Sequence, residues 1–209
     1  MIVSEFIYLC TIKLNAMGRN VEFNEDETVK KAMNVFWEKG YNGTSMQDLV
    51  DAMQINRSSL YNTIGDKQQL FLKCIDSYSD GILCETITKA KNEKSPLKAL
   101  VRIINDAVDS TIHGDKGCLG TKTIFEMGAV DKTVCNALKK SNDTYLDIII
   151  ALIKDAMAAN EIDADEDPEM IADYIMTSFT GWKQSFILHG NPIKIKKMSE
   201  YLIKNITHR

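Results

Sequence analysis

Residues 24–69 read NEDETVKKAMNVFWEKGYNGTSMQDLVDAMQINRSSLYNTIGDKQQ, and their caps and apolar spacing predict three short helices. Asn24, with a glutamate three residues later, starts the first helix in a capping-box pattern. Gly40 ends that helix, because glycine adopts the left-handed cap conformation without a steric clash. The second helix is expected to begin at Thr44, with a glutamine three residues later. Asn56 is expected to cap the third.

The third helix of this stretch carries little apolar surface. Only Leu60 and Ile64 are spaced to face inward. The other stripe consists of side chains that form hydrogen bonds, namely Arg57, Ser58, Tyr61 and Asn62. Two helices joined by a tight turn, the second short and polar on one face, are typical of a helix-turn-helix. The second helix of that motif enters the major groove of DNA.

The same stretch resembles the DNA-binding domain of the tetracycline-repressor (TetR) family. The matching positions follow the family's order and are Phe36, Gly40, Tyr41, Thr44, Asp48, Leu49, Val50, Leu60, Tyr61 and Lys67. Asn62 departs from the pattern, since many members have histidine there, and so does Ile64, where many have phenylalanine. These departures bear on base preference or packing and not on the fold.

Composition favours an all-α protein, and the caps and apolar spacing along the chain predict about nine helices. The chain has 209 residues, of which 44% are hydrophobic and 26% charged, with three prolines and no sustained strand-type alternation. No apolar run reaches the roughly 18 residues needed to cross a bilayer, so no membrane association is expected. The five cysteines show no metal-ligand or CxxC spacing, which indicates reduced thiols, no metal and a cytoplasmic location.

The family resemblance divides the chain into a small DNA-binding domain and a larger helical domain for ligand binding and dimerisation. We place the helix-turn-helix domain at residues 17–65, a connecting helix at 66–92 and the larger domain at 93–209. Residues 1–16 lack the features of a signal peptide. They are either an extension from a misassigned start codon or a flexible arm, and Arg19 is placed to reach a phosphate or the minor groove.

Charge gives a weaker indication of DNA binding than the motif does. The net charge is −4, and residues 17–80 contain seven Lys and Arg against ten Asp and Glu. A basic domain is the usual footprint of a DNA-binding protein. We therefore expect phosphate contacts from hydroxyls, helix N-termini and a few cations, and modest non-specific affinity.

The candidate DNA-binding residues have separate expected roles. Arg57 is suited to guanine or a phosphate, and Asn62 to the N6 and N7 atoms of adenine. Tyr61 is expected at the DNA backbone or a thymine methyl group, and Ser58 shares their face. Thr44 and Lys67, each at an expected helix start, are placed for phosphates. The alternative for each is an ordinary solvated polar residue.

Two long helices, at about residues 131–160 and 168–189, are apolar on most faces. Burial on two sides suggests that they pair with the same helices of a second copy in a four-helix bundle. A homodimer also suits DNA, because two recognition helices read successive major grooves of a palindrome. The alternative is a thicker monomeric core.

Aromatic side chains in the larger domain supply candidate walls for a small-molecule pocket, as the resemblance implies. They are Phe125, Tyr174, Trp182 and Phe186. Ile124 and Phe125 are expected to face inward on a short helix at about 118–128. Plain core packing is the alternative for all of them.

Cys118 is a candidate sensor of electrophiles or oxidants. It follows a turn and starts a helix, and a helix N-terminus and Lys116 both favour a thiolate. The segment resembles the Gly-Cys-Leu segment found in one branch of the family. The alternative is a small buried residue in a tight turn. A thiol enzyme using Cys118 and His113 is a remote alternative, because no third group orients the histidine.

Together these features predict a dimeric transcriptional regulator that binds a palindromic operator and is most simply a ligand- or thiol-responsive repressor. An activator or a ligand-insensitive regulator on the same fold is the alternative. No catalytic residue, metal or cofactor is expected.

Overall fold

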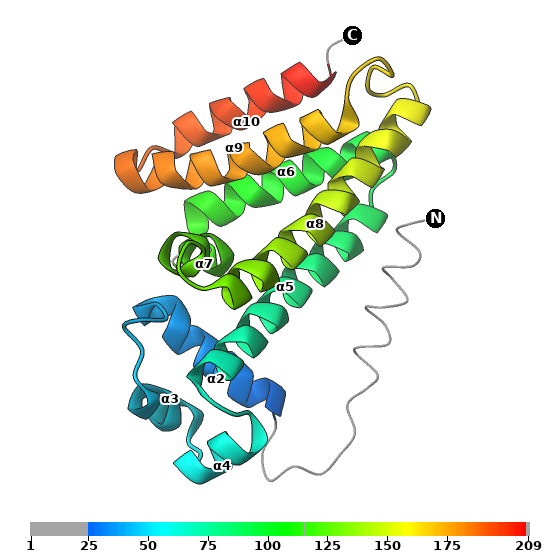
Figure 1. Cartoon of the computed structure of the whole chain (residues 1–209). Helices are drawn as coiled ribbons and strands as arrows, with labels where there is room; N and C mark the ends of the chain where they lie inside the picture. The colour runs from blue at the N-terminus through cyan, green and yellow to red at the C-terminus, as the bar shows by residue number, and fades with distance from the viewer. Residues whose placement is uncertain (1–24, 115, 208–209) are drawn as a thin grey trace. The chain divides into compact units, whose positions relative to one another are not determined.

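A computed structural model describes residues 25–114 and 116–207 (Figure 1). The described residues form helices and no strands, which confirms the all-α expectation. The helices are α2 (Glu25–Lys39), α3 (Met46–Met53), α4 (Arg57–Thr63), α5 (Lys67–Lys91), α6 (Pro96–His113), α7 (Leu119–Met127), α8 (Lys132–Ala158), α9 (Pro168–His189) and α10 (Pro192–Thr207). The expectations for residues 1–16 and for Arg19 lie outside the described residues.

The described chain divides into two compact units, and α5 and α8 each contribute to both. The head unit consists of residues 25–82 and 118–142, and the body unit of residues 83–117 and 143–207 as far as the structure describes them. Residues 118–142, which the sequence places with the larger domain, group with the three N-terminal helices instead. The head unit is therefore discontinuous in sequence.

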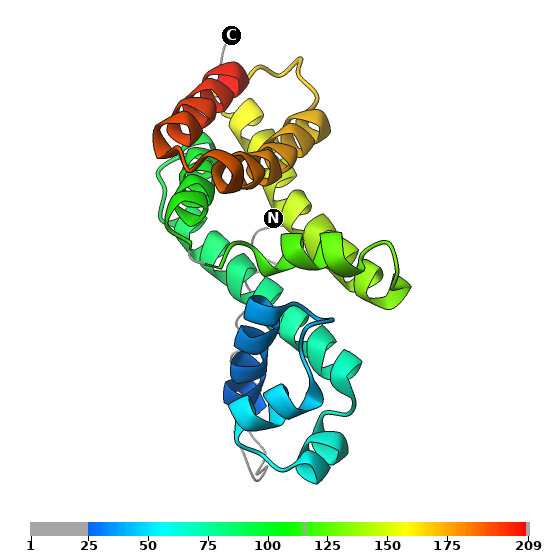
Figure 2. The same ribbon diagram turned by 90° about the vertical axis from the view of Figure 1, so that its left-hand side faces the viewer.

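The core of the head unit joins α2, α3 and α4 to the first half of α5 (Figures 1 and 2). Phe36 is fully buried, and its ring packs edge-on against Phe71 with 4.8 Å between centroids. Val29 and Ala32 continue the buried face of α2, as their spacing predicts. Met127 of α7 and the first turns of α8 complete this core.

The start of α3 differs from its prediction. Ser45, and not Thr44, is the N-cap: its hydroxyl accepts from the Asp48 amide at 3.1 Å, and the Asp48 carboxylate accepts from the Ser45 amide at 2.8 Å. A carboxylate at this position makes the stronger capping box, because it accepts hydrogen bonds with full charge. Interactions with Lys39 and Ser45 hold the pKa of Asp48 well below its usual range.

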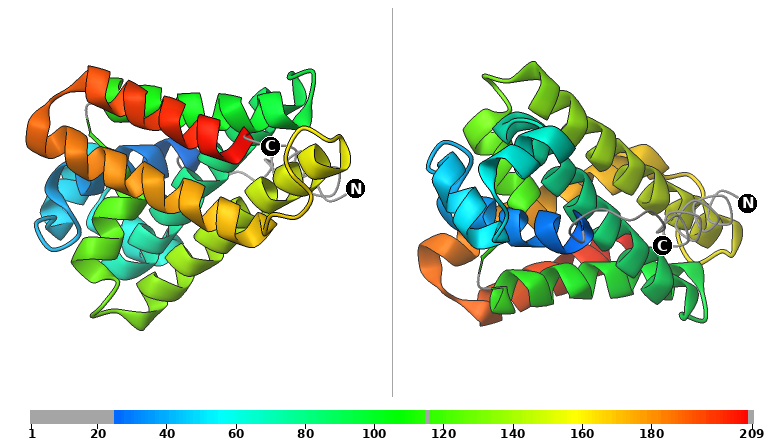
Figure 3. Two further views of the ribbon diagram at one scale, coloured as in Figure 1. Left: turned by 90° about the horizontal axis from the view of Figure 1, so that it is seen from above. Right: turned by 90° about the horizontal axis from the view of Figure 1, so that it is seen from below.

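The body unit is built from α6, α9 and α10 packed against one another and against the second part of α8 (Figure 3). Its fully buried side chains are aliphatic, among them Leu100, Ile104, Ile149, Ile153, Ile175 and Ile195. Ser95 caps α6 and Pro96 occupies its first turn. The exposed large apolar side chains of this unit lie on α9 and α10 or at their ends.

Candidate nucleic-acid interface

The α4 helix is anchored at few points. The Asn56 side chain caps it by accepting from the Ser59 amide at 2.7 Å, as predicted. Leu60 is the buried residue within its seven positions, and Ile64 is buried at its C-cap. So short a helix gains its stability from its neighbours and not from its own length.

The outer face of α4 brings together all four side chains that the sequence predicts for it. Arg57, Ser58, Tyr61 and Asn62 are exposed. The guanidinium carbon of Arg57 lies 5.8 Å from the centroid of the Tyr61 ring, within range of a cation–π interaction. The face thus offers donors from Arg57, an aromatic edge, and hydroxyl and amide groups that both donate and accept.

Lys67 is fixed against an aromatic ring at the start of α5. Its ammonium lies 4.3 Å from the centroid of Tyr41, and Tyr41 in turn contacts Phe71 at 4.8 Å. Partial burial lowers the pKa of Lys67, and the nearby Glu126 carboxylate opposes this shift. Burial and the charges of Asp131 and Asp66 raise the pKa of Tyr41. Lys67 therefore presents its charge at a defined place.

The first turn of α5 is closed by a capping box. Asp66 accepts from the Gln69 amide at 2.8 Å, and Gln69 accepts from the Asp66 amide at 3.0 Å. Thr44 has a different role from the predicted one. It is 2% exposed, and its hydroxyl donates to the Gly40 carbonyl at 2.6 Å. Its hydroxyl therefore stabilises the turn.

The turn between α2 and α3 is held by α7, a contact that the sequence does not reveal. One carboxylate oxygen of Glu126 accepts from the Tyr41 amide at 3.0 Å, and the other accepts from the Asn42 amide at 2.7 Å. Lys122, one helical turn earlier, donates to the Trp37 carbonyl at 3.2 Å. These partners are about 85 positions apart in the sequence, so no local pattern marks them.

Cys118 is the N-cap of α7 and is half-buried. Its sulfur accepts from the Thr121 amide and from the Tyr78 hydroxyl, each at 3.5 Å. Burial and the contact with Cys118 raise the pKa of Tyr78 far above its usual value, so its hydroxyl remains a donor. The Tyr78 ring packs edge-on against Trp37 of α2 at 5.1 Å.

The other thiols have different environments. Cys74, Cys118 and Cys135 form no disulfide. Cys84 is disulfide-bonded, so the expectation of reduced thiols is wrong at that residue. Burial raises the pKa of Cys74 to about 12. Within residues 25–114 and 116–207, no group of three or more His, Cys, Asp and Glu side chains is arranged to hold a metal ion.

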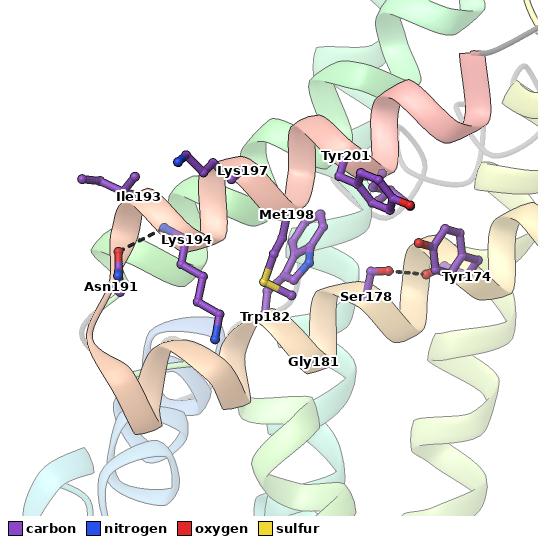
Figure 4. Close-up of a pocket in the computed structure, with 11 residues that line it drawn as sticks. Tyr174, Ser178, Gly181, Trp182, Asn191, Ile193, Lys194, Lys197, Met198 and Tyr201 are labelled. Carbon is purple, nitrogen blue, oxygen red and sulfur yellow. Dashed lines mark hydrogen bonds between the residues drawn. The ribbon is translucent and has the colours of Figure 1, made fainter.

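A groove of about 570 Å³ lies between α9 and α10 (Figure 4). Two of the predicted pocket residues, Tyr174 and Trp182, line this groove. Phe186 packs against the body core instead. Phe125 is 79% exposed on α7, and Ile124 is 50% exposed, so the expectation that they face inward is wrong. The buried side of α7 is formed by Leu119, Thr123 and Met127. Of these, Thr123 stands one position before Ile124, the first of the two residues expected to face inward.

No helix within the described residues is long and apolar enough to span a membrane.

Both the N-terminal and the C-terminal part of the chain match known protein families. Residues 29–74 match the family described as bacterial regulatory proteins, tetR family, and residues 95–202 match the tetracyclin repressor-like C-terminal domain. The uncharacterized HTH-type transcriptional regulator YezE of Bacillus subtilis (strain 168) is 38% identical over 94 residues. That match covers 45% of this chain and 48% of YezE, so the chain spans about half the length of this relative.

Solved structures show the same fold over most of the chain. A TetR-family regulator from Cytophaga hutchinsonii has a TM-score of 0.79 at 18% identity, and the match covers 90% of this chain and all of that one. The regulator CifR, as a cysteine mutant complexed with 26-bp double-strand operator DNA, has a TM-score of 0.75 at 22% identity. That match covers 89% of this chain and 98% of CifR.

Proposed function

We propose that this chain, which belongs to the TetR family of transcriptional regulators, represses its target genes. It does so by binding a palindromic operator as a homodimer. The proteins that this chain matches are regulators and not enzymes, so we assign no reaction to Cys118 and His113. Relatives such as IcaR of Staphylococcus epidermidis, which is named as a negative transcriptional regulator of a biofilm operon, favour repression over activation. A regulator that acts on chromosomal DNA works in the bacterial cytoplasm.

The observation that carries this proposal is the exposed polar face of α4. A seven-residue helix with Leu60 as its buried residue leaves Arg57, Tyr61 and Asn62 free to enter a major groove. Arg57 is suited to the O6 and N7 atoms of guanine, and Asn62 to adenine. The CifR neighbour, solved on operator DNA, supports the same use of this fold.

Phosphate contacts come from a small set of groups in the head unit. Lys67, positioned on the Tyr41 ring, supplies a cation close to α4 in the sequence. Backbone amides at the starts of α3 and α5 supply further donors. The Thr44 hydroxyl is excluded from this set because it is buried and already donates to Gly40.

The dimer forms through an apolar face on α9 and α10. Its exposed side chains are Met170, Tyr174, Ile187, Leu188, Ile193, Met198 and Tyr201. Within the described residues of α8 no large apolar side chain is exposed, so α10 replaces the helix at 131–160 in the predicted pair. A second copy covering this face would remove the apolar surface from water.

The inducer acts on groups that are not part of α4. A small ligand in the larger domain and modification of Cys118 are the two candidate signals. Cys118 is accessible in part and bonded to Tyr78, so addition of an electrophile at its sulfur displaces both the N-cap and the Tyr78 contact. We expect quinones or hypochlorite to release wild-type protein from its operator. Release that persists unchanged in Cys118→Ser would exclude the thiol signal.

The proposal is tested by selecting fragments of the source genome that the purified chain retains, and then measuring affinity for the retained sequence. Arg57→Ala should weaken binding to that sequence by about 1–3 kcal/mol, since a bidentate base contact is lost. Arg102→Ala is the matched control, because Arg102 pairs with Asp106 in the body unit. Retention of no fragment, or equal affinities for Arg57→Ala and wild type, contradicts the proposal.

A further inference from the structure

We propose that Glu126 is a positioning residue for DNA recognition, whose carboxylate fixes the turn that sets how α3 and α4 are presented to DNA. The inference rests on the proposed function and adds to it a residue of α7, a helix that belongs to the head unit without being part of the helix-turn-helix. It holds whether the inducer is a ligand or a thiol reagent.

The chemistry of the contact is specific to a carboxylate. The amides of Tyr41 and Asn42 follow each other directly beyond the end of α2, and the described backbone hydrogen bonds give neither a carbonyl acceptor. Each receives one oxygen of Glu126 instead, at 3.0 and 2.7 Å. Two parallel charge-assisted hydrogen bonds of this kind fix the orientation of a group as well as its position.

A second side chain of α7 extends the same contact onto α2 itself. The Trp37 carbonyl belongs to the last turn of α2, where carbonyls lack an intrahelical partner, and Lys122 donates to it at 3.2 Å. Lys122 and Glu126 are four positions apart and lie on one face of α7. One turn of α7 thus holds both the end of α2 and the chain that leaves it.

The turn also controls both ends of α4. On one side it leads into α3 through the Ser45 cap, with the Thr44 hydroxyl bonded to Gly40. On the other side Tyr41 supports the Lys67 ammonium at the first residue of α5. Because α4 lies between α3 and α5 in the chain and buries few side chains, its orientation follows from those two flanking helix ends.

A charge effect and a positioning role predict opposite changes in DNA affinity when Glu126 is neutralised. Glu126 is an acidic group in a unit that binds a polyanion, so neutralising it should strengthen DNA binding if its charge were all that mattered. A positioning role predicts the opposite. In Glu126→Gln one carboxylate oxygen becomes an NH₂ group, which cannot accept from an amide, while the volume of the side chain is kept.

The experiment compares wild type, Glu126→Gln and Glu166→Gln on a labelled operator duplex, taken from a retained genomic fragment, and on a scrambled duplex of equal length at one salt concentration. Glu166 is exposed between α8 and α9, so its variant matches the charge change. We expect about a tenfold loss of operator affinity for Glu126→Gln, with the scrambled duplex bound as before. Glu166→Gln should match wild type on both.

Circular dichroism separates positioning from unfolding in the same samples. If Glu126→Gln loses helical signal, Glu126→Asp takes its place, because it keeps the charge and withdraws the carboxylate by one methylene. Operator affinity equal to or above that of wild type in a folded variant overturns the inference, and so does an equal loss on both duplexes. A wild-type chain that does not distinguish the two duplexes overturns the proposed function instead.

Discussion

The α4 and α10 helices both present an exposed face, but the two faces have opposite chemistry. On α4 the exposed side chains are a guanidinium, hydroxyls and an amide, and the helix has seven residues. On α10 the exposed set includes Ile193, Met198 and Tyr201, on a helix of 16 residues. Surface that forms hydrogen bonds is suited to base edges, whereas apolar surface is suited to another protein. The two faces are therefore the proposed DNA-reading surface and the proposed subunit contact.

The largest effect should come from placing a charge on the apolar face. Tyr201 is 64% exposed and lines the groove between α9 and α10, so Tyr201→Asp should leave the monomer folded and prevent dimerisation. Losing the second reading head should reduce operator affinity by about a thousandfold, or ~4 kcal/mol. Sedimentation equilibrium and operator titration measure the two consequences together. A Tyr201→Asp variant that stays dimeric would show that this face has another role.

The next effect concerns the anchor of α4. Leu60 is fully buried, so Leu60→Ala should lower the free energy of unfolding by about 3 kcal/mol, through lost burial and the cavity that remains. Phe125→Ala is the contrast, because that ring is 79% exposed and its removal should change stability by no more than about 0.5 kcal/mol. Urea denaturation followed by circular dichroism gives both values. Equal effects would mean that α4 is not held by its apolar contact.

The smallest effect concerns the cap of α4. In Asn56→Ala the Ser59 amide loses its acceptor, which should cost about 1 kcal/mol of stability. Asn56→Asp keeps an acceptor at the same place and should stay close to wild type. Because the cap also sets where α4 begins, operator affinity should fall with stability in the alanine variant and recover in the aspartate variant. If Asn56→Ala changed neither the free energy of unfolding nor the operator affinity, Leu60 would be the main support of this helix.

Local signals in the sequence predict much of the secondary structure. Asn56, Asp66 with Gln69, and Ser95 with Pro96 act as the caps that their patterns indicate. The start of α3 is misplaced by one residue, because threonine and serine stand at adjacent positions and both residue types cap helices. The reciprocal hydrogen bonds of Asp48 select Ser45. The predicted stripe of α7 fails because nine residues define a helical phase poorly.

Long-range features are the ones that sequence patterns miss. All four predicted residues of the α4 face lie on that face, since position along a single helix fixes which way they point. Sequence patterns do not identify Tyr41 and Glu126 as site residues, because their contact joins α7 to a turn that is 85 positions away in the chain. The exposed apolar face on α9 and α10 depends on which side of α8 the core covers, and periodicity cannot decide that for a helix that is apolar on most faces.

The discontinuity of the head unit sets a limit on building chimeric regulators from this protein. A transplant of residues 25–82 alone onto a different effector domain would leave behind α7 and the first turns of α8, which complete the head core. The amides of Tyr41 and Asn42 would lose their acceptor, and the head core would lose Met127, Val134 and Leu138, so part of its apolar surface would meet water. A hybrid that keeps its target sequence must therefore carry residues 118–142 along with the N-terminal segment.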